Sequence, residues 1–200
     1  MKIGIINYGF GNSANIIKAF NKVGINCALI ENKKDIMNFD KIILPGMGSA
    51  PHAMRILKKN KLDLYIKKFN ENSNPILGIC LGFQLALNTY EIDKTNKLRC
   101  LSLIKGSVKK IENVEYPLPI INWNKVESKN KKDNLNNKLF YFSHSYYCDL
   151  SLMKKNITFV NINGKKIISS YENKNLYLYQ FHPELSGENG LNLLKKFKEL

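Results

Sequence analysis

Short apolar runs alternate with amphipathic stretches along the first half of the chain. Four runs have the length and composition of short strands: KIGIIN (2–7), NCALI (26–30), KIILPG (41–46) and PILGIC (75–80). The stretches between and after them carry apolar residues at helical spacing, which predicts helices after Gly11, over 51–70 and over LGFQLALNTY (81–90). Strands and helices in alternation are typical of a parallel sheet with helices on both faces, so the sequence predicts an α/β fold.

The second half of the chain is richer in β-forming residues. Three runs there combine aromatic and β-branched side chains: LFYFSHSYY (139–147), NITFVNI (156–162) and LYLYQFH (176–182). A helical pattern, GLNLLKKFKEL (190–200), follows them, and the Lys- and Asn-rich stretch 129–138 predicts a surface loop. With 200 residues, 44% of them apolar, we expect a single domain over residues 1–200.

The formal net charge of +15 raises the question of a nucleic-acid partner, because a basic surface attracts phosphate. Only Arg55 and Arg99 among the 31 basic residues are arginine, the residue suited to bidentate contacts with phosphate and guanine. The lysines are spread along the chain and mixed with asparagines. This pattern predicts a solvated basic surface and no nucleic-acid binding.

The sequence predicts neither a membrane-spanning segment nor a set of disulfide bonds. No segment is long and apolar enough to predict a membrane span, and the run MKIGIINYGFGN lacks a small-residue cleavage site, so we expect a cytoplasmic protein. The four cysteines, Cys27, Cys80, Cys100 and Cys148, lie far apart with no C-x-x-C pair. Their spacing predicts reduced thiols, with neither a zinc site nor a disulfide framework.

Cys80 lies in PILGICLGFQ (75–84), between a predicted strand and a predicted helix. A cysteine in an apolar run usually fills a core, because a free thiol behaves as a small hydrophobe. Here, however, G-I-C-L-G has the layout of the nucleophile elbow G-x-S-x-G, with sulfur in place of oxygen. Flanking glycines permit a sharp turn, and a following helix N-terminus favours the thiolate. The pattern predicts a nucleophile at Cys80, with the backbone N–H of Leu81 directed at a developing oxyanion.

The glycine-rich turn PGMGSA (45–50) follows another predicted strand. Turns at the carboxyl ends of parallel strands gather at the edge of the sheet where ligands bind. The turn is therefore either an ordinary tight turn or the source of a second oxyanion donor.

A nucleophilic cysteine needs a base, and the chain has three histidines: His52, His144 and His182. His52 follows a proline at a predicted helix start, where a surface role is favoured. His182 has Glu184 two residues further on, and side chains two apart in extended chain point the same way. A carboxylate so placed can fix the imidazole in one tautomer, which makes His182 the predicted base.

Together these motifs resemble those of the class I glutamine amidotransferases, whose cysteine, histidine and glutamate triad lies in G-x-C-x-G and H-P-E. The resemblance extends over essentially the whole chain through six motifs: YGFGN (8–12), PGMGSA (45–50), GICLGFQ (78–84), NWN (122–124), HSYY (144–147) and QFHPELSGENG (180–190). Among these enzymes the chain is most similar to the glutaminase subunits of imidazole glycerol phosphate synthases. The resemblance implies a flavodoxin-like fold with a central, mostly parallel sheet flanked by helices.

The resemblance also implies a role for each matching residue. Cys80 is the nucleophile, His182 the base and Glu184 its orienting partner. The other implied sets are the oxyanion hole (Gly48, Leu81), the glutamine-binding residues (Gln84, Glu91, His144, Ser145, Tyr146) and the partner interface (Asn12, Trp123, Asn124). The implied reaction is hydrolysis of L-glutamine to glutamate and ammonia through a thioester, without a metal or an organic cofactor. Ammonia would pass to a (β/α)₈ synthase subunit that makes imidazole glycerol phosphate and AICAR in histidine biosynthesis.

The sequence departs from the pattern of those subunits at three places. Ile120 and Asn122 stand in PIINWN where a histidine and a glycine are usual, and Leu185 replaces the lysine that follows H-P-E. The run RCLSL (99–103) lacks a usual glycine. The departures at 120–122 and 185 lie in motifs that face the synthase, so they leave open a paralogous subunit that feeds a sugar amidotransferase in surface-glycan synthesis.

Readings from other classes also remain open at this point. A cysteine peptidase would need an extended peptide groove, for which the sequence gives no sign. A non-catalytic basic binding module would make the set of Cys80, His182 and Glu184 a coincidence.

Overall fold

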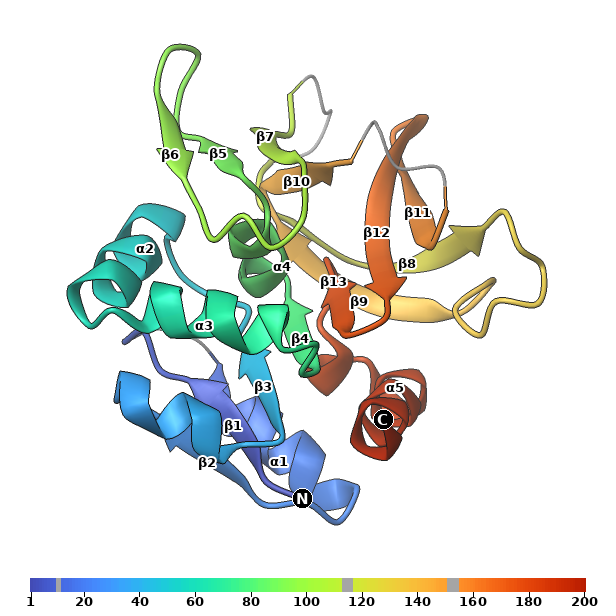
Figure 1. The fold of residues 1–200 in the computed structure, drawn as a ribbon. Coiled ribbons are helices and arrows are strands. Elements are labelled where there is room, and N and C mark those ends of the chain that lie inside the picture. The colour runs from blue at the N-terminus through green and yellow to red at the C-terminus, as the bar shows by residue number, and fades with distance from the viewer. Residues whose placement is uncertain (10–11, 113–116, 151–154) are drawn as a thin grey trace.

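The computed structural model describes residues 1–9, 12–112, 117–150 and 155–200. Phe10 and Gly11 of the YGFGN motif therefore lie outside the described residues. A nine-stranded sheet runs through the molecule in the order β2-β1-β3-β4-β13-β12-β11-β8-β9 (Figure 1). The described part of the chain contains no helix both long and apolar enough to cross a bilayer.

The first five strands of this sheet are parallel, as the alternation of strands and helices predicts. They are β2 (Cys27–Ile30), β1 (Ile3–Ile6), β3 (Lys41–Leu44), β4 (Ile76–Ile79) and β13 (Leu176–Tyr179). The last four strands are antiparallel: β12 (Lys165–Asn173), β11 (Ile157–Ile162), β8 (Ile120–Ser128) and β9 (Leu139–His144). The predicted α/β class is confirmed, and each of the three β-rich runs contains at least one strand.

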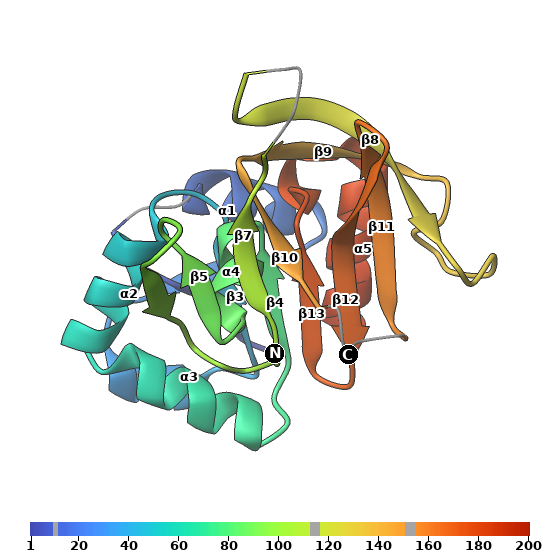
Figure 2. The same ribbon diagram turned by 90° about the horizontal axis from the view of Figure 1, so that it is seen from above.

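Helices cover both faces of the parallel strands. The helices α1 (Ser13–Lys22) and α5 (Gly187–Glu199) pack together on one face, and α2 (Ala50–Lys59), α3 (Leu62–Glu71) and α4 (Leu81–Ala86) cover the other (Figures 1 and 2). Alternate residues of one strand enter the two cores: Ile42 belongs to the buried cluster that contains Leu57 of α2, whereas Ile43 belongs to the cluster that contains Phe20 of α1. Every residue of β1, β3 and β4 is buried, as expected for strands covered on both faces, whereas the edge strand β2 exposes Leu29.

A second, four-stranded sheet packs over α4 and does not follow from the sequence pattern (Figure 2). Its order is β10 (Tyr146–Asp149), β7 (Ser107–Lys110), β5 (Thr89–Glu91) and β6 (Lys97–Arg99). The predicted helix over 81–90 was therefore wrong beyond Ala86, because the backbone groups of Asn88 form hydrogen bonds with other segments of the chain. Its N–H donates to Gly106 O (3.2 Å) and its carbonyl accepts from Cys100 N (2.9 Å), which commits the backbone to the second sheet.

The predicted single helix over 51–70 was also wrong, because the chain breaks into α2 and α3. Lys61 adopts a left-handed conformation (φ 56°) between them, and Leu62 is buried just after it. A short 3₁₀ helix, η1 (Lys33–Asn38), was not predicted. The predicted surface loop at 129–138 is confirmed: these residues belong to no helix or strand, and Leu135 anchors the loop in the core.

Candidate active site

A cavity of about 580 Å³ opens at the carboxyl edge of the parallel strands. Three chain segments that follow strands form its walls: the turn after β3, the start of α4 after β4, and the segment after β13. The lining includes Gly46, Gly48, Cys80, Leu81, Gln84, Tyr141, Ser143, His144, Ser145, Tyr146, His182 and Leu185. Most of the motifs that the sequence singled out therefore meet in one place.

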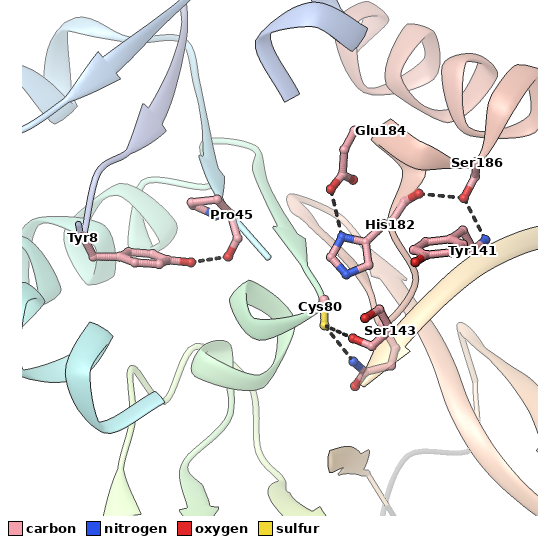
Figure 3. A network of polar contacts seen from close by, with 9 residues as sticks. Tyr8, Pro45, Cys80, Tyr141, Ser143, His182, Glu184 and Ser186 are labelled. Carbon is pink, nitrogen blue, oxygen red and sulfur yellow. Dashed lines mark hydrogen bonds and ion pairs between the residues drawn. The ribbon is translucent and has the colours of Figure 1, made fainter. Parts of the chain in front are cut away.

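Cys80 stands at the sharp turn between β4 and α4 with φ 43° and ψ −99°, an uncommon conformation for a residue with a side chain. Its two flanking glycines are required by close packing. A Cβ on Gly82 would lie 2.0 Å from the carbonyl oxygen of Leu44, and one on Gly78 would lie 2.7 Å from Leu178 Cδ2. This crowding explains the spacing G-x-C-x-G. The Sγ atom lies 3.7 Å from the carbonyl oxygen of Ser143, which accepts the thiol hydrogen (Figure 3).

The imidazole of His182 lies between Cys80 and Glu184 (Figure 3). Its Nδ1 is 2.8 Å from Glu184 Oε1, and both side chains are buried. Burial lowers the pKa of His182, but charge attraction and hydrogen bonding to Cys80, together with Glu184, outweigh burial and raise the pKa to about 10. The geometry therefore favours a protonated imidazole beside the sulfur.

The segment that carries His182 is fixed by backbone contacts to β9. The N–H of His182 donates to the carbonyl of Tyr141 (2.9 Å), and Tyr141 N–H donates to Ser186 Oγ (3.0 Å). The Ser186 hydroxyl in turn donates to the carbonyl of His182 (2.6 Å). Sequence patterns do not indicate that Ser186 closes this ring, because its other partner, the N–H of Tyr141, is 45 residues away in the chain.

Both predicted oxyanion-hole residues, Gly48 and Leu81, line the cavity, but the N–H of Leu81 already has a hydrogen-bond partner. Gly48 lines the cavity with φ 111°, but the N–H of Leu81 is hydrogen-bonded to the carbonyl of Gly46 at 3.4 Å. One residue earlier, the carbonyl of Pro45 accepts a hydrogen bond from the hydroxyl of fully buried Tyr8 (Figure 3). The turn PGMGSA is therefore held in a position where the carbonyl of Gly46 accepts the hydrogen bond of the predicted oxyanion donor, the N–H of Leu81.

The structure brings four of the five predicted glutamine-binding residues to the cavity: Gln84, His144, Ser145 and Tyr146. Tyr90 on β5 and Ile92 directly after it line the cavity, whereas Glu91 between them faces the other side of the strand, near Lys109. The structure therefore does not bring Glu91 to the cavity.

His144 is buried in the wall of the cavity. Its Nδ1–H donates to the carbonyl of Tyr146 (2.8 Å), while Nε2 has no hydrogen-bond partner within the described ranges. Burial lowers the pKa of His144 to about 4, against the opposing effect of the Tyr146 carbonyl and with a further lowering by His182. His144 is therefore neutral at physiological pH, with a lone pair at Nε2.

Sequence reasoning assigned no role to Gln180, although it lies in the QFHPE motif. Its side chain is fully buried, and its Nε2 donates to Cys80 Sγ at 3.4 Å. Two signals mark it: Gln180 stands two residues before His182, and it directly follows the strand that pairs with β4.

The predicted interface residues lie at and near the rim of the cavity. Asn12 lines it, Trp123 is 48% exposed on β8, and Asn124 is partly buried with an Nδ2 that lacks a partner in the described part of the chain. His52 is not a lining residue; its Nδ1 contacts Arg55 Nη2 at 3.0 Å. Within the described ranges, no cluster of three or more His, Cys, Asp or Glu side chains could hold a metal ion.

Comparisons with known proteins identify the family to which the chain belongs. The model of the family Glutamine amidotransferase class-I matches residues 4–199. The Listeria innocua protein named imidazole glycerol phosphate synthase subunit HisH is 36% identical, with 98% of this chain and 94% of that protein covered. The protein of that name from Caldanaerobacter subterraneus is 37% identical, with 99% and 98% covered.

Two solved structures share the fold at low sequence identity. A glutamine amidotransferase superposes with a TM-score of 0.75 at 14% identity over 100% of both chains. PurLQS from Thermotoga maritima gives a TM-score of 0.74 at 18% identity over 99% of this chain and 97% of that one. With a family model over nearly all of its length and relatives above one-third identity, the chain belongs to the class I glutamine amidotransferases.

Proposed function

We propose that this chain is the glutaminase subunit of an imidazole glycerol phosphate synthase, with Cys80, His182 and Glu184 as its catalytic triad. The single observation that carries the triad is the placement of His182 between Cys80, which shares the cavity with it, and the buried carboxylate of Glu184 behind it. Relatives that bear the synthase subunit's name over nearly the whole chain support the choice of pathway. The proposal includes a single catalytic domain and a cytoplasmic location.

The proposed reaction forms and breaks one thioester. The Cys80 thiolate attacks the side-chain amide carbon of glutamine, and the carbonyl oxygen becomes an oxyanion. The protonated His182 gives its proton to the amide nitrogen, the C–N bond breaks and ammonia leaves. His182 then takes a proton from water, the hydroxide adds to the thioester, and the C–S bond breaks to release glutamate and the thiolate. Glu184 holds the imidazole in the tautomer that both steps need.

Four cavity residues are proposed to bind the substrate: Gln84, His144, Ser145 and Tyr146. The buried Nε2 lone pair of His144 offers an acceptor to the amino or amide group of glutamine. Gly48 and Leu81 would hold the oxyanion once the N–H of Leu81 is released from Gly46.

A partner surface adjoins the cavity on β8 and β9. Three large apolar side chains are exposed on these strands: Ile121, Trp123 and Leu139. Register places Trp123 opposite Tyr141, with ring centroids 6.0 Å apart, and Tyr141 lies 6.3 Å from the ring of His182. Tyr141 therefore connects an exposed aromatic anchor with the catalytic base.

We propose that a (β/α)₈ synthase subunit docks on this surface to form a heterodimer and receives the ammonia. Leu185 lines the cavity, and Ile120 lies on β8 directly before the exposed Ile121, so two of the three departures from the usual pattern lie beside the proposed interface. On a synthase subunit that pairs an acidic residue with the usual lysine, Leu185 would leave that acid buried and unpaired. This costs several kcal/mol unless the synthase residue has changed too. The proposal therefore includes a co-adapted synthase surface.

The test is glutamine hydrolysis by the purified chain alone, with the synthase subunit from the same cell, and with a sugar amidotransferase. We expect stimulation by the synthase subunit loaded with its ribonucleotide. Stimulation only by the sugar enzyme would replace the histidine pathway with surface-glycan synthesis. Absence of hydrolysis in every combination would overturn the glutaminase proposal itself.

A further inference from the structure

We propose that Gln180 is a second hydrogen-bond donor to the reacting sulfur, stabilising the Cys80 thiolate together with His182. This inference rests on the proposed function of the same cavity. It adds to the triad a buried amide that contacts the nucleophile directly.

The sheet itself brings the two residues together. In the parallel pair β4 and β13, Ile79 lies opposite Tyr179, so the next residue of each strand emerges at the same level. The N–H of Cys80 donates to the carbonyl of Tyr179 (2.7 Å), and the N–H of Gln180 donates to the carbonyl of Ser169 (2.8 Å). Both backbones are therefore fixed where the side chains meet, with Gln180 Nε2 at 3.4 Å from Cys80 Sγ.

The orientation of the Gln180 amide is set from its other end. Its Oε1 accepts from Gln84 Nε2 (3.2 Å), one helical turn after Cys80, and from the thiol of Cys148 (3.8 Å). A flipped amide would place oxygen against the lone pairs of Cys80 and turn its NH₂ toward two donors. Because the side chain is fully buried, water cannot compensate for such a flip. The amide nitrogen must face the sulfur.

The contacts of Cys80 differ between its two protonation states. The neutral thiol donates to the carbonyl of Ser143 at 3.7 Å, which an anionic sulfur cannot do. A thiolate needs donors, and the structure supplies them in Gln180 and His182. The titratable side chains around the sulfur are His182, Tyr8, Tyr90 and Cys148, contributed by the segment after β13 and by segments near β1, β5 and β10. Of these, the protonated His182 is the cation, so Gln180 adds a neutral donor.

The test is the pH dependence of Cys80 alkylation by iodoacetamide, read at each cysteine by peptide mass spectrometry. This readout follows the thiolate in the full chain and does not require glutamine hydrolysis. In Gln180→Met, which keeps the volume and removes the donor, the alkylation midpoint should rise by about one pH unit. Below the midpoint, the rate should fall roughly tenfold. Thr158→Val is the matched control, because it removes a buried hydroxyl of the same sheet that bonds to Ser169 and Ser170.

A second measurement on the wild-type chain does not depend on the folding of Gln180→Met. The chain has only two glutamines, Gln84 and Gln180, so ¹⁵N-glutamine labelling gives two side-chain amide signals. The amide that contacts Cys80 should shift with the same pH midpoint as alkylation, and the shift should vanish in Cys80→Ala. Two results would overturn the proposal: an alkylation midpoint that is unchanged in folded Gln180→Met, or side-chain amide signals that do not shift with pH at that midpoint. Such a result would leave the glutaminase assay unaffected, so the two proposals fail separately.

Discussion

The backbone N–H of Leu81 is hydrogen-bonded to the carbonyl oxygen of Gly46, 3.4 Å away. A carbonyl in this position takes up a donor of the proposed oxyanion hole, and its own oxygen would repel the developing charge. Loss of one such donor costs about 10²- to 10³-fold in catalysis. We therefore expect slow hydrolysis by the chain alone, and we expect a partner that releases Leu81 to shift the population toward the active arrangement.

Tyr8→Phe should raise hydrolysis by the isolated chain. The Tyr8 hydroxyl donates to the carbonyl of Pro45, next to Gly46, and so holds the turn in its present position. A neutral hydrogen bond contributes about 1 kcal/mol, which corresponds to roughly a fivefold rise in basal rate. Tyr177→Phe is the control, because Tyr177 packs against Phe197 of α5 on the opposite face of the sheet. A basal rate unchanged in Tyr8→Phe would show that this bond does not hold the turn closed.

Cys80 should be labelled before the other three cysteines by a diazo-ketone analogue of glutamine. Burial raises the pKa of Cys27 and of Cys100 to about 12, and burial also raises the pKa of Cys148 well above its ordinary value. Only Cys80 lines the cavity among the four, and it lies beside His182. Peptide mapping by mass spectrometry gives the order of labelling. Equal labelling of all four thiols would return Cys80 to a core-filling role.

His182→Asn should lower glutamine hydrolysis by roughly 10²- to 10⁴-fold, the range for a positioned acid–base group. Glu184→Gln should have a smaller effect, because it weakens the 2.8 Å contact that orients the imidazole and leaves the imidazole in place. His52→Asn is the matched control, since His52 contacts Arg55 outside the cavity lining. Initial rates in the presence of the synthase subunit measure all three. If His52→Asn were the most damaging change, the proposed triad would be wrong.

The sequence predicted the strand that ends at Cys80 and the glycines around it, because a strained turn in a crowded sheet leaves a local signature. It did not predict the second sheet, since the partners of Asn88 are backbone groups that become neighbours only in three dimensions. The same holds for the site. His182 and Glu184 are two residues apart and visible as a pair, whereas Gln180 reaches Cys80 only through strand pairing between residues a hundred positions apart.

His144 should make the fold sensitive to acid. Its pKa is lowered from 6.5 to about 4 in the folded state, so between these pH values the unfolded chain binds a proton there that the folded chain does not. Stability therefore falls as the pH drops through this window, by roughly 2–3 kcal/mol for this group. His182, whose pKa is raised, keeps its proton in the folded state, whereas the unfolded chain begins to lose it near pH 6.5. His182 therefore adds little slope below about pH 5.5 and a slope of opposite sign near and above pH 6.5.

The measurement is urea unfolding at several pH values between 4 and 7 for the wild type and for His144→Asn. The comparison uses the slope of the free energy of unfolding against pH, because the substitution also changes packing. The variant should lose part of the wild-type slope. Equal slopes would mean that the buried His144 is not the group that binds the proton on unfolding.

Trp123→Ala should weaken the complex with the synthase subunit. Trp123 is 48% exposed, and Ile121 (59%) and Leu139 (48%) lie on the same pair of strands, which makes it the aromatic anchor of an apolar surface. Truncation of such an anchor costs about 2 kcal/mol, or roughly thirtyfold in Kd. Leu64→Ala is the control: Leu64 is similarly exposed (56%), but it lies on α3.

The same variant also tests whether docking reaches the catalytic base. Trp123 contacts Tyr141, and Tyr141 contacts His182, so the anchor and the base share one aromatic neighbour. If docking acts through Tyr141, Trp123→Ala should lower the stimulation of hydrolysis even when the synthase subunit is saturating. Calorimetric binding and hydrolysis rates at saturation separate the two effects. Wild-type affinity in Trp123→Ala would place the interface elsewhere, and full stimulation at saturation would restrict Trp123 to binding.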